Sequence, residues 1–181
     1  MTMVFQYGSN TLESEINSAR RLNGRARFVS IAETVENYVL VFDVFSKSAD
    51  RNCATSNIVP TAEQKKVWGV LYEVPDELIS RQSAPEGSVS LDAIEGENKN
   101  HRRHCIRVRK PNGEEVSALT YVTLKPKKRV QRKTSLKYAQ LIIQGLQQHK
   151  VPQPYIEQVK TIIATHSPRL AKAISAIQAA D

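Results

Sequence analysis

The sequence predicts an α+β domain in which a mainly antiparallel sheet or small barrel comes first and a helical C-terminal third follows. Three observations favour this fold class. Segments rich in β-branched and aromatic residues fill most of the first two thirds of the 181 residues, the last third has the apolar spacing of helices, and no internal repeat or convincing linker divides the chain. With 40% hydrophobic and 24% charged residues, the chain suits one globular domain with a sizeable core.

The first element is a short strand that runs into Val4-Phe5-Gln6-Tyr7-Gly8-Ser9-Asn10, where apolar residues give way to three turn formers. Beyond this turn, apolar residues recur at helical spacing, and Asn10 with Glu13 is typical of a capping arrangement, so a helix is expected there. Unpaired N–H groups at such a junction attract negative charge, and Gly8 would permit the close approach of a ligand or a positive φ. An ordinary capped turn is the alternative.

Six further strands are expected. Two lie on either side of a polar break at Glu36-Asn37 within residues 26–45, and the others cover residues 53–59, 67–74, 104–109 and 116–124. Ile106 and Val108 share one face of their strand, and Pro111-Asn112-Gly113 turns it into the last one. The polar stretch 75–100 holds at most short helices, whereas residues 135–180 are helical, with prolines at 152, 154 and 168 between the helices.

Leu91-Asp92-Ala93-Ile94-Glu95-Gly96 contains a candidate acid–base residue. Leu91 and Ile94 could partly desolvate Glu95, and a carboxyl group in such surroundings can take up and return a proton near neutral pH. A solvated acid in a polar loop is the alternative interpretation, with Asp92 and Glu97 as equal candidates.

Taken together and in this order, several motifs resemble those of the γ-glutamylcyclotransferase family. The motifs span roughly residues 4 to 160, whereas the tail after His166 lies outside the resemblance. They are Phe5-Gln6-Tyr7-Gly8-Ser9-Asn10, Asn57-Ile58-Val59-Pro60, Val67-Trp68-Gly69-Val70-Leu71-Tyr72, Leu91 to Gly96, and Ser135-xx-Tyr138-xxx-Ile142-xx-Gly145 leading to Val151-Pro152 and Tyr155.

The resemblance implies a small mixed or antiparallel β-barrel of about five to seven strands surrounded by α-helices. We expect residues 1–166 to form this domain and residues 167–181 to be a helical extension of it. The implied enzyme is a γ-glutamylcyclotransferase, in which the α-amine of a γ-glutamyl amino acid or γ-glutamyl amine attacks its own γ-amide to give 5-oxoproline and a free amino acid or amine. No cofactor is required.

The resemblance also implies the site residues. Glu95 matches the catalytic acid and base, and the turn matches the substrate-binding loop, whose N–H groups would face a carboxylate or the developing oxyanion. The substrate-binding residues are expected to be Val4, Phe5, Gln6, Tyr7, Gly8, Ser9 and Tyr138. His101 stands where relatives commonly carry an aromatic residue before two basic ones, which affects part of the pocket wall. The partner is a small γ-glutamyl molecule, and a homodimer is possible.

A metal site is not expected. His101, His104 and Cys105 are near one another, but strand alternation would send His104 and Cys105 to opposite faces, and no second pair of ligands is evident. Cys53 and Cys105 are too few for a disulfide framework and are expected to be reduced core residues.

The chain is basic, with a formal net charge of +8 and a pI of about 9.6. Six of the nine residues from Lys125 to Lys133 are basic. The alternative function is a basic module that binds nucleic acid or another anion through this segment, or a catalytically idle domain. The segment lacks interleaved aromatic residues, so a solvated loop is its usual identity. Without a membrane span or signal peptide, we expect a cytoplasmic protein.

Overall fold

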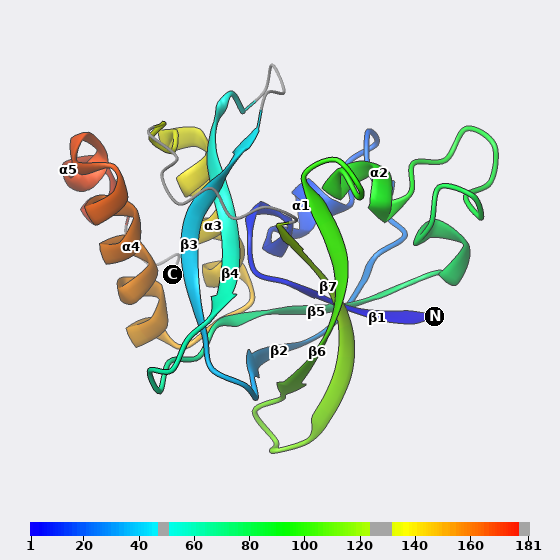
Figure 1. Cartoon of the computed structure of the whole chain (residues 1–181), viewed down its shortest axis with the longest axis horizontal. Helices are drawn as coiled ribbons and strands as arrows, with labels where there is room; N and C mark the ends of the chain where they lie inside the picture. Colours follow the sequence, from blue (N-terminus) through cyan, green and yellow to red (C-terminus); the bar gives the residue numbers. More distant parts are fainter. Residues whose placement is uncertain (47–50, 124–131, 178–181) are drawn as a thin grey trace.

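A computed structural model describes residues 1–46, 51–123 and 132–177. Five strands form a closed barrel in the order β1-β5-β2-β6-β7, and β3 and β4 form a separate two-stranded sheet (Figure 1). The strands are β1 Thr2–Gln6, β2 Arg27–Thr34, β3 Tyr38–Ser46, β4 Cys53–Pro60, β5 Trp68–Val74, β6 His101–Arg109 and β7 Glu115–Thr123.

The barrel is mixed because one of its pairs is parallel. Strand β1 lies antiparallel to β5 and parallel to β7, with Val4 opposite Leu119, while the β2–β5, β2–β6 and β6–β7 pairs are antiparallel. The α+β class and the small mixed barrel that the sequence predicted are therefore confirmed. The expected seven strands all form, and β6 begins three residues earlier than the sequence indicated.

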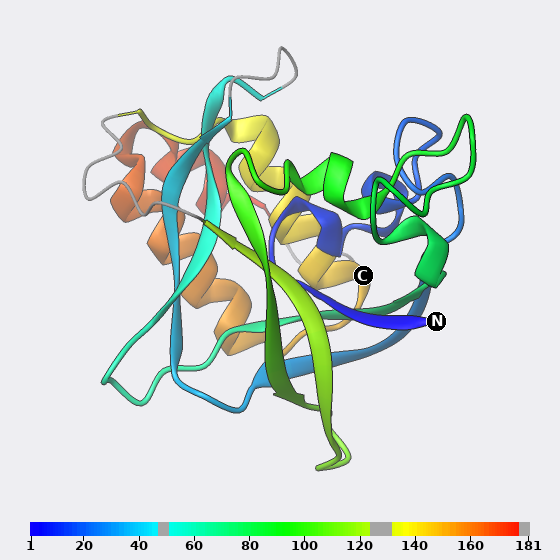
Figure 2. The same ribbon diagram turned by 45° about the vertical axis from the view of Figure 1, so that its right-hand side comes forward.

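The helices of the C-terminal third follow the last strand, as expected. They are α3 Leu136–Gln148, α4 Gln153–His166 and the short α5 Ala171–Ser175, which follows a 3₁₀ turn, η3, at Pro168–Leu170. The Ser135 hydroxyl caps α3 by accepting a hydrogen bond from the N–H of Tyr138 at 3.2 Å. Figure 2 shows α4 behind β3 and β4, on the side of this pair away from the barrel. No helix within the described ranges is long and apolar enough to cross a membrane.

The core has two parts. The larger part joins the inner faces of the strands to α3 and α4, and includes Phe5, Leu71, Ile142 and Ile163, all fully buried. The smaller part lies around β1, β5 and the segment 76–95, where Leu91 is fully buried. Leu91 therefore anchors the short helix α2, Leu91–Glu95, to the barrel.

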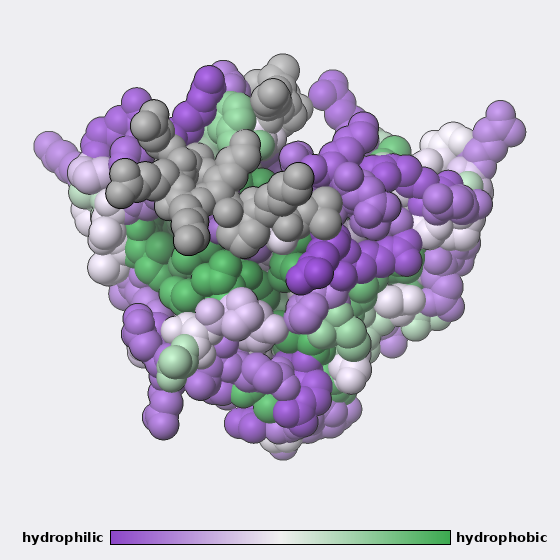
Figure 3. All heavy atoms as spheres, viewed as in Figure 1, coloured by the Kyte–Doolittle hydropathy of each residue, from purple (hydrophilic) through white to green (hydrophobic). Residues whose placement is uncertain are grey.

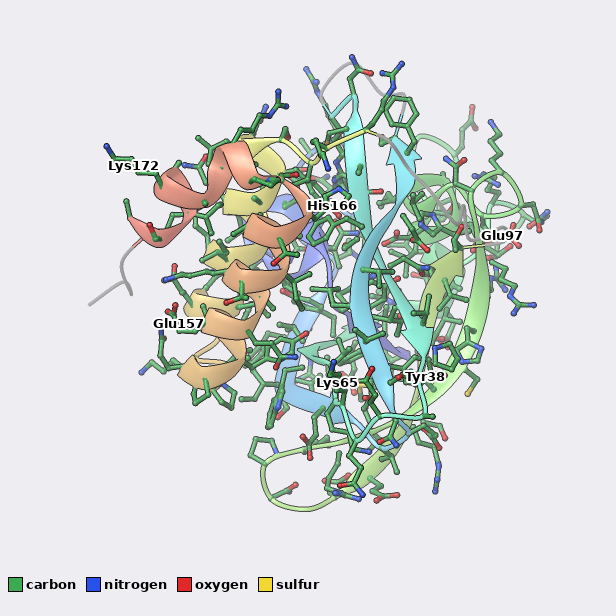
Figure 4. All side chains as sticks on the ribbon, turned by 60° about the vertical axis from the view of Figure 1, so that its left-hand side comes forward. Tyr38, Lys65, Glu97, Glu157, His166 and Lys172 are labelled. Carbon is green, nitrogen blue, oxygen red and sulfur yellow. The ribbon has the colours of Figure 1, made fainter. Side chains whose placement is uncertain are left out.

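The surface near β3 and β4 and the side chains of the C-terminal helices can be followed in Figure 3 and Figure 4. Figure 3 shows an apolar area near β3 and β4, with mostly hydrophilic side chains around it. In Figure 4, Glu157 and Lys172 point outwards from α4 and α5, whereas His166 points towards β3. The His166 ring stacks with Phe42, with the centroids 5.4 Å apart, and burial lowers the pKa of this imidazole. The end of α4 is thus packed against the sheet.

The helix predicted after Asn10 is much shorter than expected. It consists of a 3₁₀ turn, η1, at Ser9–Thr11 and one helical turn, α1, at Glu13–Ile16. The Asn17 side chain holds the backbone of Ala26 through two hydrogen bonds of 2.8 and 2.9 Å, so the chain folds back instead of continuing as a helix. The expected cap is also wrong, because the Asn10 side chain makes no capping bond and is engaged elsewhere, as described below.

The cysteine prediction is half correct. Cys53 is buried and free, whereas Cys105 is free but exposed on β6. Ile106 and Val108 on the same strand are buried, as the alternation predicted. Cys105 lies on the outward face of this strand, which explains why it is not a core residue.

Candidate functional site

A polar pocket with an empty volume of about 410 Å³, its open mouth included, lies where the end of β1 meets α2, α3 and β4. Seven parts of the chain contribute side chains to it. Its lining consists of Gln6, Tyr7, Gly8, Ser9 and Asn10 from the first turn, Arg51 from the β3–β4 connection, Thr55 and Ser56 from β4, Glu95 from α2, His101 from β6, Thr120 and Tyr121 from β7, and Tyr138 from α3.

Glu95 is the last residue of α2 and presents its carboxylate to this pocket. The helix begins at Ser90, whose hydroxyl accepts a hydrogen bond from Ala93 N–H at 3.2 Å, and ends at Gly96, which has a left-handed φ of 66°. Glu95 Oε1 accepts hydrogen bonds from Asn10 Nδ2 at 2.7 Å and Gln6 Nε2 at 3.2 Å. Oε2 has no hydrogen-bond partner within the described part of the chain, so it can accept a proton from a ligand.

The other two candidate acids of this segment lie elsewhere. Asp92 is almost fully buried, and its carboxylate accepts two hydrogen bonds from Arg103, at 2.9 and 2.5 Å, and one from the Tyr121 hydroxyl at 2.7 Å. Burial alone would raise the pKa of Asp92, but the hydrogen bonds and charge of Arg103 outweigh burial and lower it. Glu97 does not line the pocket. Of these three acids, Glu95 is the one that the pocket exposes to a ligand.

The turn after β1 approaches β4 and α3 closely at Gly8. A Cβ at this position would lie 2.6 Å from Ser56 Oγ and 3.4 Å from the Tyr138 hydroxyl. Gly8 has φ −105°, so the close approach of β4, and not a left-handed backbone, requires glycine here. Within the described ranges, the N–H groups of Gly8, Ser9 and Asn10 have no hydrogen-bond acceptor. Three unpaired donors therefore adjoin the pocket.

The structure brings most of the predicted substrate-binding residues together. Gln6, Tyr7, Gly8, Ser9 and Tyr138 all line the pocket. Val4 and Phe5 do not line it, because both are fully buried in β1. They lie in the strand that leads into the turn.

Two tyrosines shape the pocket wall. The Tyr7 hydroxyl donates to the backbone oxygen of Tyr121 at 2.5 Å, and burial, followed by the charge of Glu95, raises the Tyr7 pKa well above its ordinary value. The Tyr138 hydroxyl accepts the N–H of Ser56 at 3.2 Å and lies 2.9 Å from its Oγ. Tyr7 is therefore a neutral structural donor, while Tyr138 fixes β4 against the turn.

Arg21, Arg51 and Asn10 complete the site, and none of them was among the predicted site residues. Arg21 Nη1 donates to Asn10 Oδ1 at 2.6 Å, which orients the Asn10 amide so that its NH₂ group faces Glu95. Arg51 Nη2 donates to Ser9 Oγ at 3.0 Å and to Glu15 Oε1 at 2.9 Å. Asn10 lies in a motif that was already prominent, but no local pattern marks Arg21 or Arg51.

His101 borders Glu95, as its place in the sequence indicated. Its Nδ1 lies 2.6 Å from the Glu95 carbonyl oxygen, and since a carbonyl can only accept, Nδ1 carries the proton of this hydrogen bond. His104 turns to the Tyr38 hydroxyl, at 3.1 Å from its Nε2, and Cys105 is exposed. Among the residues that the structure describes, no three His, Cys, Asp or Glu side chains are grouped so that they could hold a metal ion.

The basic segment Lys125 to Lys133 lies mostly outside the described residues. At its described end, the Arg132 guanidinium lies 4.3 Å from the ring centroid of Phe45. This contact is a cation–π interaction at the end of β3.

Comparison with known proteins gives the family. The AIG2-like family model matches residues 66–159, slightly more than half of the chain. No curated protein matches the sequence significantly.

Solved structures resemble the whole fold. A protein described as γ-glutamyl cyclotransferase is 21% identical, covers 96% of this chain and 98% of its own, and has a TM-score of 0.74. An uncharacterised human protein is 22% identical over 89% of this chain and 87% of its own, with a TM-score of 0.73. YkqA of Bacillus subtilis is 18% identical over 91% of this chain and 55% of its own, with a TM-score of 0.72. The chain thus belongs to the AIG2-like family and has the γ-glutamylcyclotransferase-like fold that the motifs of its sequence predicted.

Proposed function

We propose that this protein is a γ-glutamylcyclotransferase-type enzyme that converts a γ-glutamyl amino acid or γ-glutamyl amine into 5-oxoproline and a free amino acid or amine. The observation that carries the proposal is the Glu95 carboxylate, which is held by Asn10 and Gln6 beside the turn at Gly8 and opens onto a small polar pocket. A reaction within one small molecule fits such a pocket. The proposal places the reaction in the cytoplasm and requires no cofactor.

Glu95 would carry the proton through the reaction. Its carboxylate takes a proton from the α-ammonium of the substrate, and the resulting amine attacks the γ-carbonyl carbon. The new C–N bond closes the five-membered ring, the bond from the γ-carbon to the leaving nitrogen breaks, and Glu95 returns the proton to that nitrogen. The ring nitrogen gives up its second proton, and the released amine takes up one to become an ammonium. Since nucleophile and electrophile belong to one molecule, holding the substrate curled provides a large effective molarity, and proton transfer contributes a further ~10²–10⁴ in rate.

The turn would stabilise the negative charge on the γ-carbonyl oxygen during the attack. The N–H groups of Gly8, Ser9 and Asn10 adjoin the pocket and have no acceptor among the described residues. Backbone donors that are fixed before the reaction need no reorganisation, and the loss of one such donor typically reduces the rate by about 10²–10³. The close packing at Gly8 holds this turn in place.

The proposal is tested by incubating the purified protein with a panel of γ-glutamyl amino acids and γ-glutamyl amines and measuring 5-oxoproline by mass spectrometry. We expect product from at least one compound of the panel. The same compounds with an acetylated α-amine are the matched control, because they lack the nucleophile. Absence of 5-oxoproline across the whole panel would contradict the proposal.

A further inference from the structure

Arg51 is held in the pocket wall, and the cyclisation steps proposed above assign it no role. Its side chain is 21% exposed, and three groups hold it. Ser9 Oγ and Glu15 Oε1 accept from its Nη2, and its guanidinium lies 5.4 Å from the ring centroid of Tyr138. An arginine that is held on several sides loses little freedom when it binds a ligand.

The charges around Arg51 favour the binding of an anion there. Glu15 Oε1 accepts from both Arg21 and Arg51, at 2.8 and 2.9 Å, so one carboxylate is shared by two guanidinium groups. Burial and then the nearby Arg51 charge lower the pKa of Arg21, which indicates repulsion between the two cations. A ligand carboxylate at Arg51 would reduce this repulsion.

Arg51 also keeps donors for such a carboxylate. Both N–H groups of Nη2 are used by Ser9 and Glu15. Its Nη1 and Nε carry three further N–H groups, which have no hydrogen-bond partner within the part of the chain that the structure describes. Guanidinium groups bind carboxylates through two such donors at once.

The cation and the anion of the pocket are attached to neighbouring residues of the same turn. Arg51 bonds to Ser9 at 3.0 Å, and Glu95 accepts from Asn10 at 2.7 Å. A ligand at this turn therefore meets a guanidinium and a carboxylate close together. The matching chemical group is an α-amino acid head, in which an ammonium and a carboxylate share one carbon atom.

We propose that Arg51 binds the α-carboxylate of the γ-glutamyl group while Glu95 receives the α-ammonium. This proposal rests on the proposed function, and it makes Arg51 a specificity-determining residue. The pocket then selects γ-glutamyl compounds with a free α-carboxylate and a free α-amine, and Arg51 does not distinguish the groups that are released.

The test compares three substrates with two Arg51 variants. The substrates are γ-glutamylalanine, its α-carboxamide, which lacks the α-carboxylate, and γ-glutamylethylamine, which lacks the carboxylate of the released group. For Arg51→Met we expect kcat/KM for γ-glutamylalanine and γ-glutamylethylamine to fall equally, by about 10- to 100-fold, as for loss of a hydrogen-bonded ion pair. The α-carboxamide should be a poor substrate for the parent and hardly change in the variant.

The second Arg51 variant and a control at Arg25 separate recognition from folding. Arg51→Lys keeps the charge but not the two-donor geometry, so its loss of kcat/KM should be smaller than that of Arg51→Met. Arg25→Met is the matched control, since Arg25 forms an exposed ion pair with Glu77 at 3.0 Å, away from the pocket. This control should retain the parent's kcat/KM for all three substrates.

Other outcomes would overturn the proposal. If Arg51→Met reduced turnover of γ-glutamylalanine but not of γ-glutamylethylamine, Arg51 would bind the carboxylate of the released amino acid. If the variant discriminated against the α-carboxamide as strongly as the parent does, Arg51 would not bind the α-carboxylate of the substrate.

Calorimetric titration with 5-oxoproline and with its carboxamide distinguishes failure of this proposal from failure of the proposed function. We expect the parent to bind 5-oxoproline more tightly than the carboxamide, and Arg51→Met to lose this difference. If no substrate were turned over but this result were obtained, the enzymatic function would be wrong and the recognition by Arg51 would stand. Equal heats for the two compounds in the parent would overturn the recognition.

Discussion

The two acidic residues of α2 lie three positions apart and have opposite environments. Asp92 points to the barrel, where Arg103 and Tyr121 donate three hydrogen bonds to it and only 4% of its side chain is exposed. Glu95, one turn further on, faces the pocket and has neutral amide donors on one oxygen. The comparison teaches that the partner groups, and not the residue type, separate a carboxylate that is fully engaged in the fold from one that keeps an oxygen open to a ligand.

The partners also explain why the two residues are not interchangeable. A guanidinium favours the charged form of Asp92 and lowers its pKa, so this residue stays ionised and cannot return a proton at neutral pH. The neutral amides of Gln6 and Asn10 orient Glu95, which forms no ion pair within the described residues. Asp92 thereby fixes the helix that carries Glu95, which links the stability of α2 to the position of the proposed catalytic group.

The largest expected effect comes from Glu95→Gln, which removes the proposed base and keeps the side-chain size. Turnover should fall by at least ~10², while substrate binding persists and the melting temperature is nearly unchanged. Steady-state kinetics and calorimetric binding measure the two quantities separately. Glu97→Gln is the matched control and should retain the parent's rate, because Glu97 does not line the pocket. A Glu95→Gln protein that makes 5-oxoproline as fast as the parent would refute the mechanism.

Asp92→Asn should affect stability more than chemistry. Removing the charge weakens its bonds with Arg103 and Tyr121, so the free energy of unfolding should fall by about 1–3 kcal/mol. Since the folded-state pKa of Asp92 is lowered, its contribution is present above the ordinary value of 3.8 and is lost as pH falls below it. Denaturant unfolding at several pH values measures both effects. Equal acid sensitivity of parent and variant below this pH would show that Asp92 is not the structural carboxylate.

Arg21→Met tests how Glu95 is positioned and should have the smallest effect. Without the bond from Arg21 to Asn10 Oδ1, the Asn10 amide is free to rotate and holds Glu95 less firmly. We expect kcat to fall about 3- to 10-fold with KM within about 2-fold of the parent, as for loss of one hydrogen bond. Arg21→Lys should recover part of kcat. A change in KM alone would show that Arg21 acts on substrate binding instead.

Much of the fold was determined by local sequence. Alternation and β-branched residues predicted the strands. For example, Ile106 and Val108 were expected on one face of β6, and both are buried. Ser135 caps α3, and Gly96 ends α2 immediately after Glu95. Hydrophobic periodicity and capping act over one or two turns of chain, and so they are visible without tertiary contacts.

Only the tertiary structure decided which side chains meet. Asn10 was interpreted as a helix cap, but its amide bonds to Glu95, 85 positions away in the sequence. Arg51 meets Ser9 across 42 positions, and no local pattern marks either contact. By itself, the sequence determined the elements, the family and the residues that its motifs contain. Closure of the barrel in the order β1-β5-β2-β6-β7 decided the partners of Asp92 and Glu95, and the placement of the separate β3–β4 pair decided those of Arg51, because contacts between distant segments depend on how packed elements are arranged in space.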